Sequence, residues 1–131
     1  MTGHRQLRRV LVVDDEKIIA DTLAQILIAS GFSAEVAYSG EEAVEMAKWV
    51  HPDVLIADVI MGGINGVESA MSIKNAVPEC RVILCSGQIK SEELVHKAED
   101  LGYRFEFMLK PVHPNVLLKR LKHLLRVDGA A

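Results

Sequence analysis

Five short apolar runs, each followed by a segment with helical spacing, constrain this chain more than any other feature. The runs cover residues 9–13, 32–37, 53–57, 81–85 and 103–109. The continuous run at residues 9–13 favours a β-strand that is buried on both faces, whereas residues 32–37 have the alternating pattern of a second strand. Strict alternation of strands with crossovers of about ten residues or more predicts parallel strands with helices on both sides. Because such crossovers are right-handed, the sequence predicts a doubly wound α/β domain with a five-stranded parallel sheet and five helices.

The segments between the runs carry the start signals and apolar stripes of helices. Ser39 followed by Glu42 is a capping pattern, and Pro114 is suited to the first turn of the last helix. Apolar residues three or four apart mark the face that a helix turns toward the core. The predicted inner faces of the first, second and last helices are Ile19, Leu23, Ile26 and Leu27; Ala43, Met46, Ala47 and Val50; and Leu117, Leu118, Leu121, Leu124 and Leu125.

Length, charge and cysteine content exclude several classes of protein. The chain of 131 residues is the size of one domain, predicted to span 1–131 with a folded core of about 8–127, and leaves no room for a tethered output domain. A net charge of −3 predicts no direct contact with nucleic acid, and no apolar run approaches the roughly 20 residues needed for membrane insertion. Two cysteines cannot form a disulfide scaffold, and no apolar h-region of a secretory signal follows Arg5, Arg8 and Arg9. Both observations favour a cytoplasmic location.

Polar residues follow four of the five predicted strands. Asp14 and Asp15 come after the first strand, Asp58 after the third, Ser86 after the fourth and Lys110 after the fifth. Parallel sheets bind ligands at the carboxyl ends of their strands, beside the point where the strand order reverses. The sequence therefore predicts that three carboxylates, a hydroxyl and an ammonium group converge at one edge of the sheet.

This set of groups suits phosphoryl chemistry with a divalent cation. Carboxylates about 4 Å apart repel each other by roughly 4 kcal/mol at an effective dielectric constant near 20, so they need a cation. Oxygen ligands favour Mg²⁺, which keeps several waters and leaves room for a phosphoryl group. A carboxylate beside Mg²⁺ can attack phosphorus and form an aspartyl phosphate. Ser86 and Lys110 are then predicted to contact the phosphoryl oxygens.

Residues 8–127 resemble the receiver domain of bacterial two-component response regulators, with a chemotaxis-regulator-like fold. The resemblance rests on Val13-Asp14-Asp15-Glu16, Asp58, Ser86 and Lys110-Pro111, which follow one another as in that family. It implies a flavodoxin-like sheet of order 2-1-3-4-5 and a phosphoryl group accepted on Asp58 from a histidine kinase or histidine phosphotransfer protein. It also implies a downstream protein target and only slow self-phosphorylation and autodephosphorylation.

The resemblance assigns roles to further residues. Asp15, Asp58 and the backbone carbonyl of Ile60 would bind Mg²⁺, with Asp14 contributing mostly through water. The hydroxyl of Ser86 would move toward the phosphoryl group while Phe107 turns inward as the switch aromatic. Ile18 lies off the predicted inner face of its helix and is a candidate contact for the kinase. Ile60 and Gln88 would flank the path of the hydrolytic water.

Three features depart from the commonest receiver pattern. Gly62 stands where a proline often follows the phosphorylated strand, which predicts a looser loop. Phe107 lacks the phenolic hydroxyl often found at its position. The segment between Ser86 and Lys110 is slightly long and rich in aromatic residues.

Several alternatives stay open at this stage. The chain could be a receiver cut from a longer regulator, or an interaction module that works without phosphorylation. A Mg²⁺-dependent phosphohydrolase is disfavoured because no second aspartate stands two residues after Asp58. Cys80, Cys85 and Trp49 are interpreted as core residues. The five histidines and a basic stripe on the last helix are interpreted as solvated surface: Lys119, Lys122, His123 and Arg126.

Overall fold

The computed structural model of the chain describes residues 7–87 and 91–128. The strands are β1 (Arg9–Val13), β2 (Ser33–Ala37), β3 (Val54–Asp58), β4 (Arg81–Ser86) and β5 (Glu106–Leu109). The helices are α1 (Lys17–Ala29), α2 (Gly40–Val50), α3 (Gly66–Ala76), α4 (Ser91–Asp100) and α5 (Pro114–Asp128). Strands and helices alternate along the described chain, as the sequence predicts.

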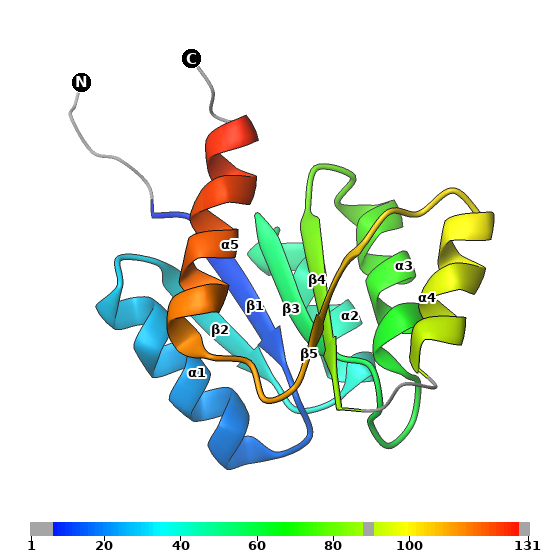
Figure 1. Cartoon of the computed structure of the whole chain (residues 1–131), viewed down its shortest axis with the longest axis horizontal. Coiled ribbons are helices and arrows are strands. Elements are labelled where there is room, and N and C mark those ends of the chain that lie inside the picture. The colour runs from blue at the N-terminus through cyan, green and yellow to red at the C-terminus, as the bar shows by residue number, and fades with distance from the viewer. Residues whose placement is uncertain (1–6, 88–90, 129–131) are drawn as a thin grey trace.

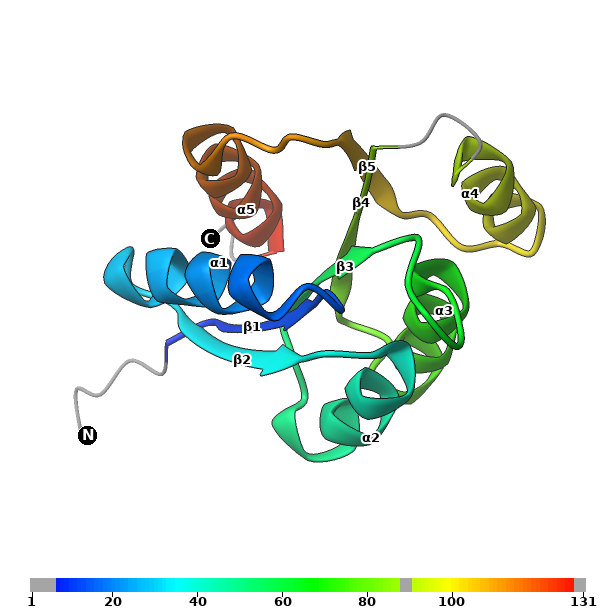
Figure 2. The same cartoon turned by 90° about the horizontal axis from the view of Figure 1, so that it is seen from below.

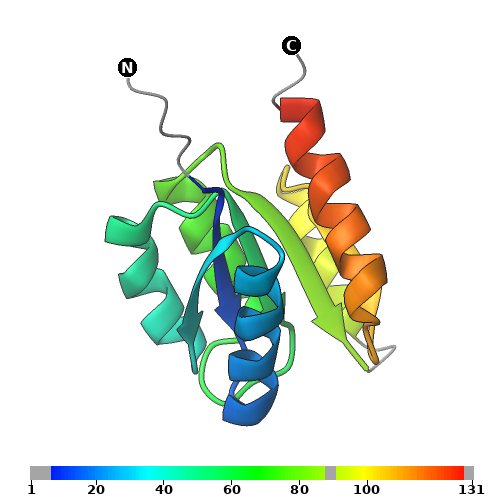
Figure 3. The same cartoon turned by 90° about the vertical axis from the view of Figure 1, so that its left-hand side faces the viewer.

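The strands form one parallel sheet in the order β2-β1-β3-β4-β5. Helices α1 and α5 cover one face of the sheet, and α2, α3 and α4 cover the other (Figures 1 and 2). All strand arrows point toward the same edge, where α1 and α5 begin (Figures 1 and 3). The predicted fold class and strand order are confirmed, and the strand order reverses between β1 and β3.

Two buried clusters, one on each face of the sheet, form the core. Leu11 and Val13 of β1 belong to the cluster under α2, α3 and α4, whereas Val10 and Val12 belong to the cluster under α1 and α5. Successive side chains of a strand point to opposite faces, so an unbroken apolar run fills both clusters. This is why β1, β3 and β4 read as continuous apolar sequence.

Strand β5 is shorter than the sequence predicts, because it begins at Glu106 and not at Tyr103. The hydroxyl of Tyr103 donates to Oδ1 of Asn75 on α3 at 2.8 Å, and the rings of Tyr103 and Phe105 lie 5.7 Å apart. Both aromatic residues pack against the core under α2, α3 and α4. Tyr103 and Phe105 therefore bury part of their side chains while they lie in the segment that connects α4 to β5.

The inner face of α1 also differs from the prediction. Ala20, Ala24 and Leu27 are the buried residues of this helix, whereas Ile19 is 43% exposed. The buried set keeps the expected spacing but is rotated by one residue, since small alanine side chains let the helix approach the sheet closely. Leu23 packs partly against the core. The prediction that Ile19 lies on the inner face is therefore wrong.

Other predictions about the core are tested by burial. Trp49 is 73% exposed, so its interpretation as a core residue is wrong, whereas Cys80 and Cys85 are buried thiols as predicted. Burial raises the pKa of each thiol to about 12, in keeping with a packing role. In α5, Leu117, Leu121 and Leu125 are buried.

The predicted surface positions agree with the structure where it describes them. The exposed set comprises His51, His96, His113, Lys119, Lys122 and His123. The remaining predicted surface residues, His4 and the side chain of Arg126, lie outside what the structure describes. Among the described residues, no helix has the length and apolar character needed to cross a membrane.

The capping pattern at α2 is present. The backbone amide of Glu42 donates to Oγ of Ser39 at 3.1 Å, and the amide of Tyr38 donates to the Glu42 carboxylate at 2.8 Å. The helix ends where His51 adopts a left-handed conformation, with φ of 48°, before Pro52. Sequence signals therefore located both ends of this helix.

Candidate functional site

Two aspartates stand side by side where the strand order reverses. Asp14 directly follows β1, and Asp58 is the last residue of β3. The two strands are neighbours, with Val13 opposite Ala57, and the amide of Asp14 donates to the carbonyl of Ala37 at 3.2 Å. Sheet pairing on both sides therefore places the two carboxylates at the same edge.

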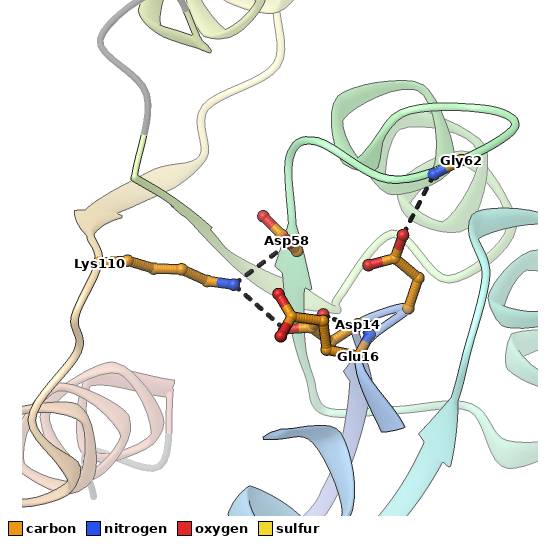
Figure 4. A network of polar contacts seen from close by, with 6 residues as sticks. Asp14, Glu16, Asp58, Gly62 and Lys110 are labelled. Atoms are coloured by element: carbon orange, nitrogen blue, oxygen red, sulfur yellow. Dashed lines mark hydrogen bonds and ion pairs between the residues drawn. The ribbon is translucent and has the colours of Figure 1, made fainter. Parts of the chain in front are cut away.

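Lys110 joins these two carboxylates from the far side of the site. Its Nζ atom lies 3.2 Å from Oδ2 of Asp14 and 3.2 Å from Oδ2 of Asp58 (Figure 4). The backbone amide of Lys110 donates to the carbonyl of Ser86 at 2.9 Å, which ties its position to the end of β4. The side chains of Asp14 and Asp58 are nearly buried, so this ion pair network is shielded from solvent.

Asp15 is the third member of an acidic cluster with Asp14 and Asp58, and it is more exposed to solvent than the other two. One carboxylate oxygen from each of Asp14, Asp15 and Asp58 lies within 4.8 Å of the others. Asp15 is exposed, and its Oδ2 accepts a long hydrogen bond of 3.4 Å from the amide of Gly62 (Figure 4). Three negative charges against the one ammonium of Lys110 leave an excess of negative charge. The donors therefore fit a hard divalent cation, which prefers oxygen ligands.

Burial and neighbouring charges shift the pKa of two groups in the site. Burial raises the pKa of Asp58, although the charge of Lys110, its hydrogen bond and the amide of Ile60 act in the opposite direction. The negative charge of Asp14 acts together with burial to raise the pKa of Asp58. Burial alone would lower the pKa of Lys110, but the charges of Asp58 and Asp14 outweigh it and raise that pKa. The lysine is thus held as a cation next to the carboxylate.

Ser86 and Phe107 occupy neighbouring strands but different environments. Ser86 ends β4, is 1% exposed, and follows Cys85, which is aligned with Asp58 in the sheet. Phe107 of β5 is half-buried and packs against the core under α2, α3 and α4. Gln88 lies outside the described residues.

The loop after β3 carries Ile60, whose side chain is 41% exposed. Gly66 returns the chain to the site, since its amide donates to the carbonyl of Val59 at 2.8 Å. A Cβ atom at Gly66 would collide with the carbonyl oxygen of Asp58, so only glycine fits this approach. The tight contact between the start of α3 and the backbone of Asp58 was not predicted from the sequence.

An apolar cavity of about 550 Å³ opens beside the acidic cluster. It lies between α1 and the segment that follows Lys110, and both Asp58 and Lys110 line its polar end. Ile18 is 82% exposed and belongs to its rim, in agreement with the prediction that this residue lies off the inner face. This cavity was not predicted from the sequence.

Comparison with curated proteins places the chain in a family. The sequence model of the family described as the response regulator receiver domain matches residues 10–122 of this chain. The chemotaxis protein CheY of Thermotoga maritima is 31% identical over 115 residues, which cover 87% of this chain and 94% of that protein. A cyclic di-GMP phosphodiesterase of the same organism is 35% identical over 117 residues, or 89% of this chain. The response regulator MprA of Mycobacterium avium is 30% identical over 118 residues, or 90% of this chain.

Some of these relatives are much longer than the region they share with this chain. The chain spans 31% of the phosphodiesterase and 51% of MprA. Among solved structures, a receiver domain protein from Clostridium thermocellum has a TM-score of 0.84 at 25% identity, with coverage of 95% of this chain and 98% of that one. The receiver domain of the hybrid histidine kinase CckA has a TM-score of 0.74 at 29% identity, with coverage of 89% and 98%. The chain therefore belongs to the family of response regulator receiver domains.

Proposed function

We propose that this receiver accepts a phosphoryl group on Asp58, in a Mg²⁺-dependent reaction, from a histidine kinase or histidine phosphotransfer protein. The phosphorylated form then acts as a switch or carrier toward a downstream protein target. The observation that supports this most directly is the contact of Lys110 Nζ with both Asp14 and Asp58 beside the exposed carboxylate of Asp15. Because some relatives are longer, the same role also fits a receiver within a larger regulator.

The proposed transfer is a displacement at phosphorus. An oxygen of the Asp58 carboxylate attacks the phosphorus of a phosphohistidine, and the bond between phosphorus and the imidazole nitrogen breaks. The nitrogen keeps the electron pair and takes up a proton from solvent. Lys110 holds one oxygen of Asp58 in place before the reaction and balances the charge of the phosphoryl group afterwards. The hydroxyl of Ser86 would donate to a phosphoryl oxygen.

Asp15, Asp58 and the backbone carbonyl of Ile60 would hold Mg²⁺, with Asp14 acting mostly through water. The cation supplies neutralisation of the charge on the phosphoryl oxygens. The acidic cluster supports this assignment, since its carboxylates are close together and outnumber the one ammonium group. In this role the protein is a signalling module, with enzymology restricted to slow self-phosphorylation from small donors and slow autodephosphorylation.

Intact-mass measurement after incubation with acetyl phosphate tests the proposal. We expect the gain of one phosphoryl group in the presence of Mg²⁺ and no gain when the cation is chelated before the incubation. A profile of phosphotransfer from the histidine kinases of the host then identifies the donor. A chain that gains no phosphoryl group from acetyl phosphate or from any kinase contradicts the proposed function.

Ile18 is expected to contribute to docking of the phosphodonor protein. It is exposed at the rim of the cavity beside Asp58, where an apolar side chain can be covered by a partner. We expect Ile18→Ala to slow phosphotransfer from the cognate kinase by roughly tenfold, on the scale of one buried apolar contact, while labelling by acetyl phosphate is unchanged. Ile28→Ala is a matched control, because Ile28 is exposed at the other end of α1. Equal slowing of both reactions in Ile18→Ala would defeat the docking role.

Ile60 is expected to prolong the life of the phosphorylated state. Its side chain is partly exposed beside Asp58, cannot orient a water by hydrogen bonding, and has the bulk to exclude one. Water-positioning groups contribute about 100-fold or more to such reactions, so we expect Ile60→Asn to speed decay of the aspartyl phosphate by up to that factor. Decay is followed at constant Mg²⁺, with Ile60→Leu as the variant that retains apolar bulk. An unchanged or slower decay in Ile60→Asn would show that Ile60 does not set the lifetime.

Phe107 would transmit the signal through packing alone, since it has no hydroxyl with which to exchange hydrogen bonds. A shift from 1:99 to 99:1 in a two-state equilibrium needs about 5.5 kcal/mol of differential binding. Packing of Phe107 without a hydroxyl supplies a smaller bias than this. We therefore expect a modest conformational change on the face formed by α4, β5 and α5. The movement of the Ser86 hydroxyl toward the phosphoryl group and the inward turn of Phe107 stay predictions.

A further inference from the structure

The loop between β3 and α3, residues 59–65, is held by carboxylates from two other segments. The amide of Gly62 donates to Oδ2 of Asp15 at 3.4 Å, and the amide of Ile64 donates to Oε2 of Glu41 at 3.2 Å. Asp15 belongs to the segment after β1, and Glu41 belongs to the first turn of α2. Two hydrogen bonds from within the loop that carries Ile60 therefore tie it to other parts of the chain, in addition to its connections to β3 and α3.

The start of α2 fits closely against this loop. Gly40 is buried, and a Cβ atom there would lie 2.7 Å from Cγ1 of Ile64. The Glu41 carboxylate lies so near Gly63 that a Cβ atom at Gly63 would be 2.5 Å from Oε2. Gly63 has a φ of +78°, a conformation that glycine adopts without strain. Two glycines, one on each side of the contact, thus allow the carboxylate to reach the backbone of the loop.

The two carboxylates differ in what a bound cation would do to them. Asp15 is one of three acids in the candidate cation site, and its 3.4 Å hydrogen bond is too long to be strong. A cation bound at Asp15 uses the same carboxylate that accepts from the Gly62 amide and draws negative charge away from that hydrogen bond. Glu41 is not a member of this acidic cluster, so its hydrogen bond to Ile64 does not compete with the cation.

The two adjacent glycines of this loop, Gly62 and Gly63, give it little conformational restriction of its own. Gly62 has no atom within 4 Å of the place where its Cβ would stand, so neighbouring side chains do not confine it. Adjacent glycines at 62 and 63 increase the conformational entropy that the loop loses on ordering. An acceptor that stays in place when the cation binds offsets part of that loss.

We propose that Glu41 is a positioning residue, which holds the loop carrying Ile60 in the arrangement that the cation site requires. The proposal rests on the proposed function, because it assigns Ile60 to that site. Glu41 acts through its hydrogen bond to the Ile64 amide and not through its charge. The sequence analysis missed Glu41, which is exposed and separated in sequence from every predicted site residue.

Three variants separate the hydrogen bond from the charge. Glu41→Ala removes both, Glu41→Gln retains an acceptor oxygen without the charge, and Glu45→Ala removes a charge from the next turn of the same helix. Within the described residues, the exposed Glu45 carboxylate pairs with Lys48 at 2.8 Å on its own helix, so this variant is a matched control.

The readouts are the Mg²⁺ dissociation constant, from titration followed by NMR, and hydrogen exchange at the Ile64 amide. We expect Glu41→Ala to weaken Mg²⁺ binding roughly five- to tenfold, the scale of one hydrogen bond, and to speed exchange at Ile64. We expect Glu41→Gln to stay within about twofold of the wild type in both readouts, and Glu45→Ala to match the wild type.

Two results would overturn the inference. If Glu41→Gln weakens Mg²⁺ binding as much as Glu41→Ala, Glu41 acts by charge. If Glu41→Ala behaves like Glu45→Ala, the hydrogen bond does not position the loop. Labelling of the wild-type chain by acetyl phosphate separates these failures from that of the proposed function. A chain that is labelled at Asp58 but indifferent to Glu41 refutes this inference alone, whereas a wild type that neither binds Mg²⁺ nor is labelled refutes both.

Discussion

Replacement of Asp58 by asparagine is expected to abolish incorporation of phosphate from acetyl phosphate. An amide has no anionic oxygen with which to attack phosphorus, and no second carboxylate ends β3. The fold is expected to persist, because the amide is close in size to the carboxylate and Lys110 keeps its contact with Asp14. The measurement is intact mass after incubation with acetyl phosphate and Mg²⁺. Labelling that survives in Asp58→Asn would show that another residue is the acceptor.

The same variant is expected to be more stable than the wild type when Mg²⁺ is absent. Burial raises the pKa of Asp58 above its ordinary value of 3.8, so ionisation of this carboxyl costs more in the folded state than in the unfolded state. The stability associated with its protonated form is complete below pH 3.8 and is lost as the pH rises through the raised pKa. Asparagine does not ionise, so the variant does not lose this stability. Its free energy of unfolding should exceed that of the wild type by an increasing amount as the pH rises from 3.8 through the raised pKa of Asp58.

Urea unfolding at a series of pH values, with a chelator present, measures this difference. The control is the same series with Mg²⁺ added, because a cation that binds only the folded wild type stabilises it and narrows or reverses the gap. A wild type that is more stable than Asp58→Asn at pH 7 without any cation would contradict the expected cost of the buried carboxylate.

Gly66→Ala is expected to destabilise the fold and to disturb the site together. The added methyl group would overlap the carbonyl oxygen of Asp58 and lie 3.0 Å from Cα of Val59, and both of these belong to the backbone. Backbone cannot swing aside as a long side chain can, so the start of α3 and the end of β3 must separate. Overpacking of this kind costs about 1–3 kcal/mol. We expect a loss of about that size in urea unfolding, with slower labelling of Asp58 by acetyl phosphate.

Gly62→Ala provides the matched control in the same loop. A Cβ atom at Gly62 meets nothing within 4 Å, and its φ does not lie in the left-handed region. The variant should therefore be neutral or more stable by about 0.4–1 kcal/mol, since alanine restricts the unfolded chain. If both variants lose similar stability, the effect arises from the loop as a whole. In that case the close approach of Gly66 to Asp58 is not its cause.

The strands and the acidic site could be predicted because their signals are local. Continuous apolar runs such as Val10–Val13 specify strands buried on both faces, and the residues that follow them mark the edge where ligands bind. Asp14, Asp15, Asp58 and Lys110 meet in the structure as expected. Parallel pairing brings the ends of separate strands to one edge, so the position of each residue along its own strand was sufficient information.

The errors of sequence reasoning arose where packing chooses between local alternatives. The spacing of apolar residues in α1 fits two faces one residue apart, and the closer approach allowed by Ala20 and Ala24 selects the one that exposes Ile19. Trp49 is apolar, but it lies at the end of α2, where no neighbouring element covers it enough to bury it. Tyr103 and Phe105 have strand propensity, yet they lie in the segment before β5 and pack against the core under α2, α3 and α4.

The sequence by itself determined the order of elements, the parallel sheet and the identity of the polar residues at its edge. These follow from hydrophobic periodicity and chain connectivity, which are properties of short segments. Only the tertiary structure decided that Lys110 Nζ bridges Asp14 and Asp58 at 3.2 Å, that Gly66 approaches Asp58 and that the Ile64 amide donates to Glu41. Each of these contacts is made over a few ångströms, and such distances depend on how the helices and loops pack on the sheet.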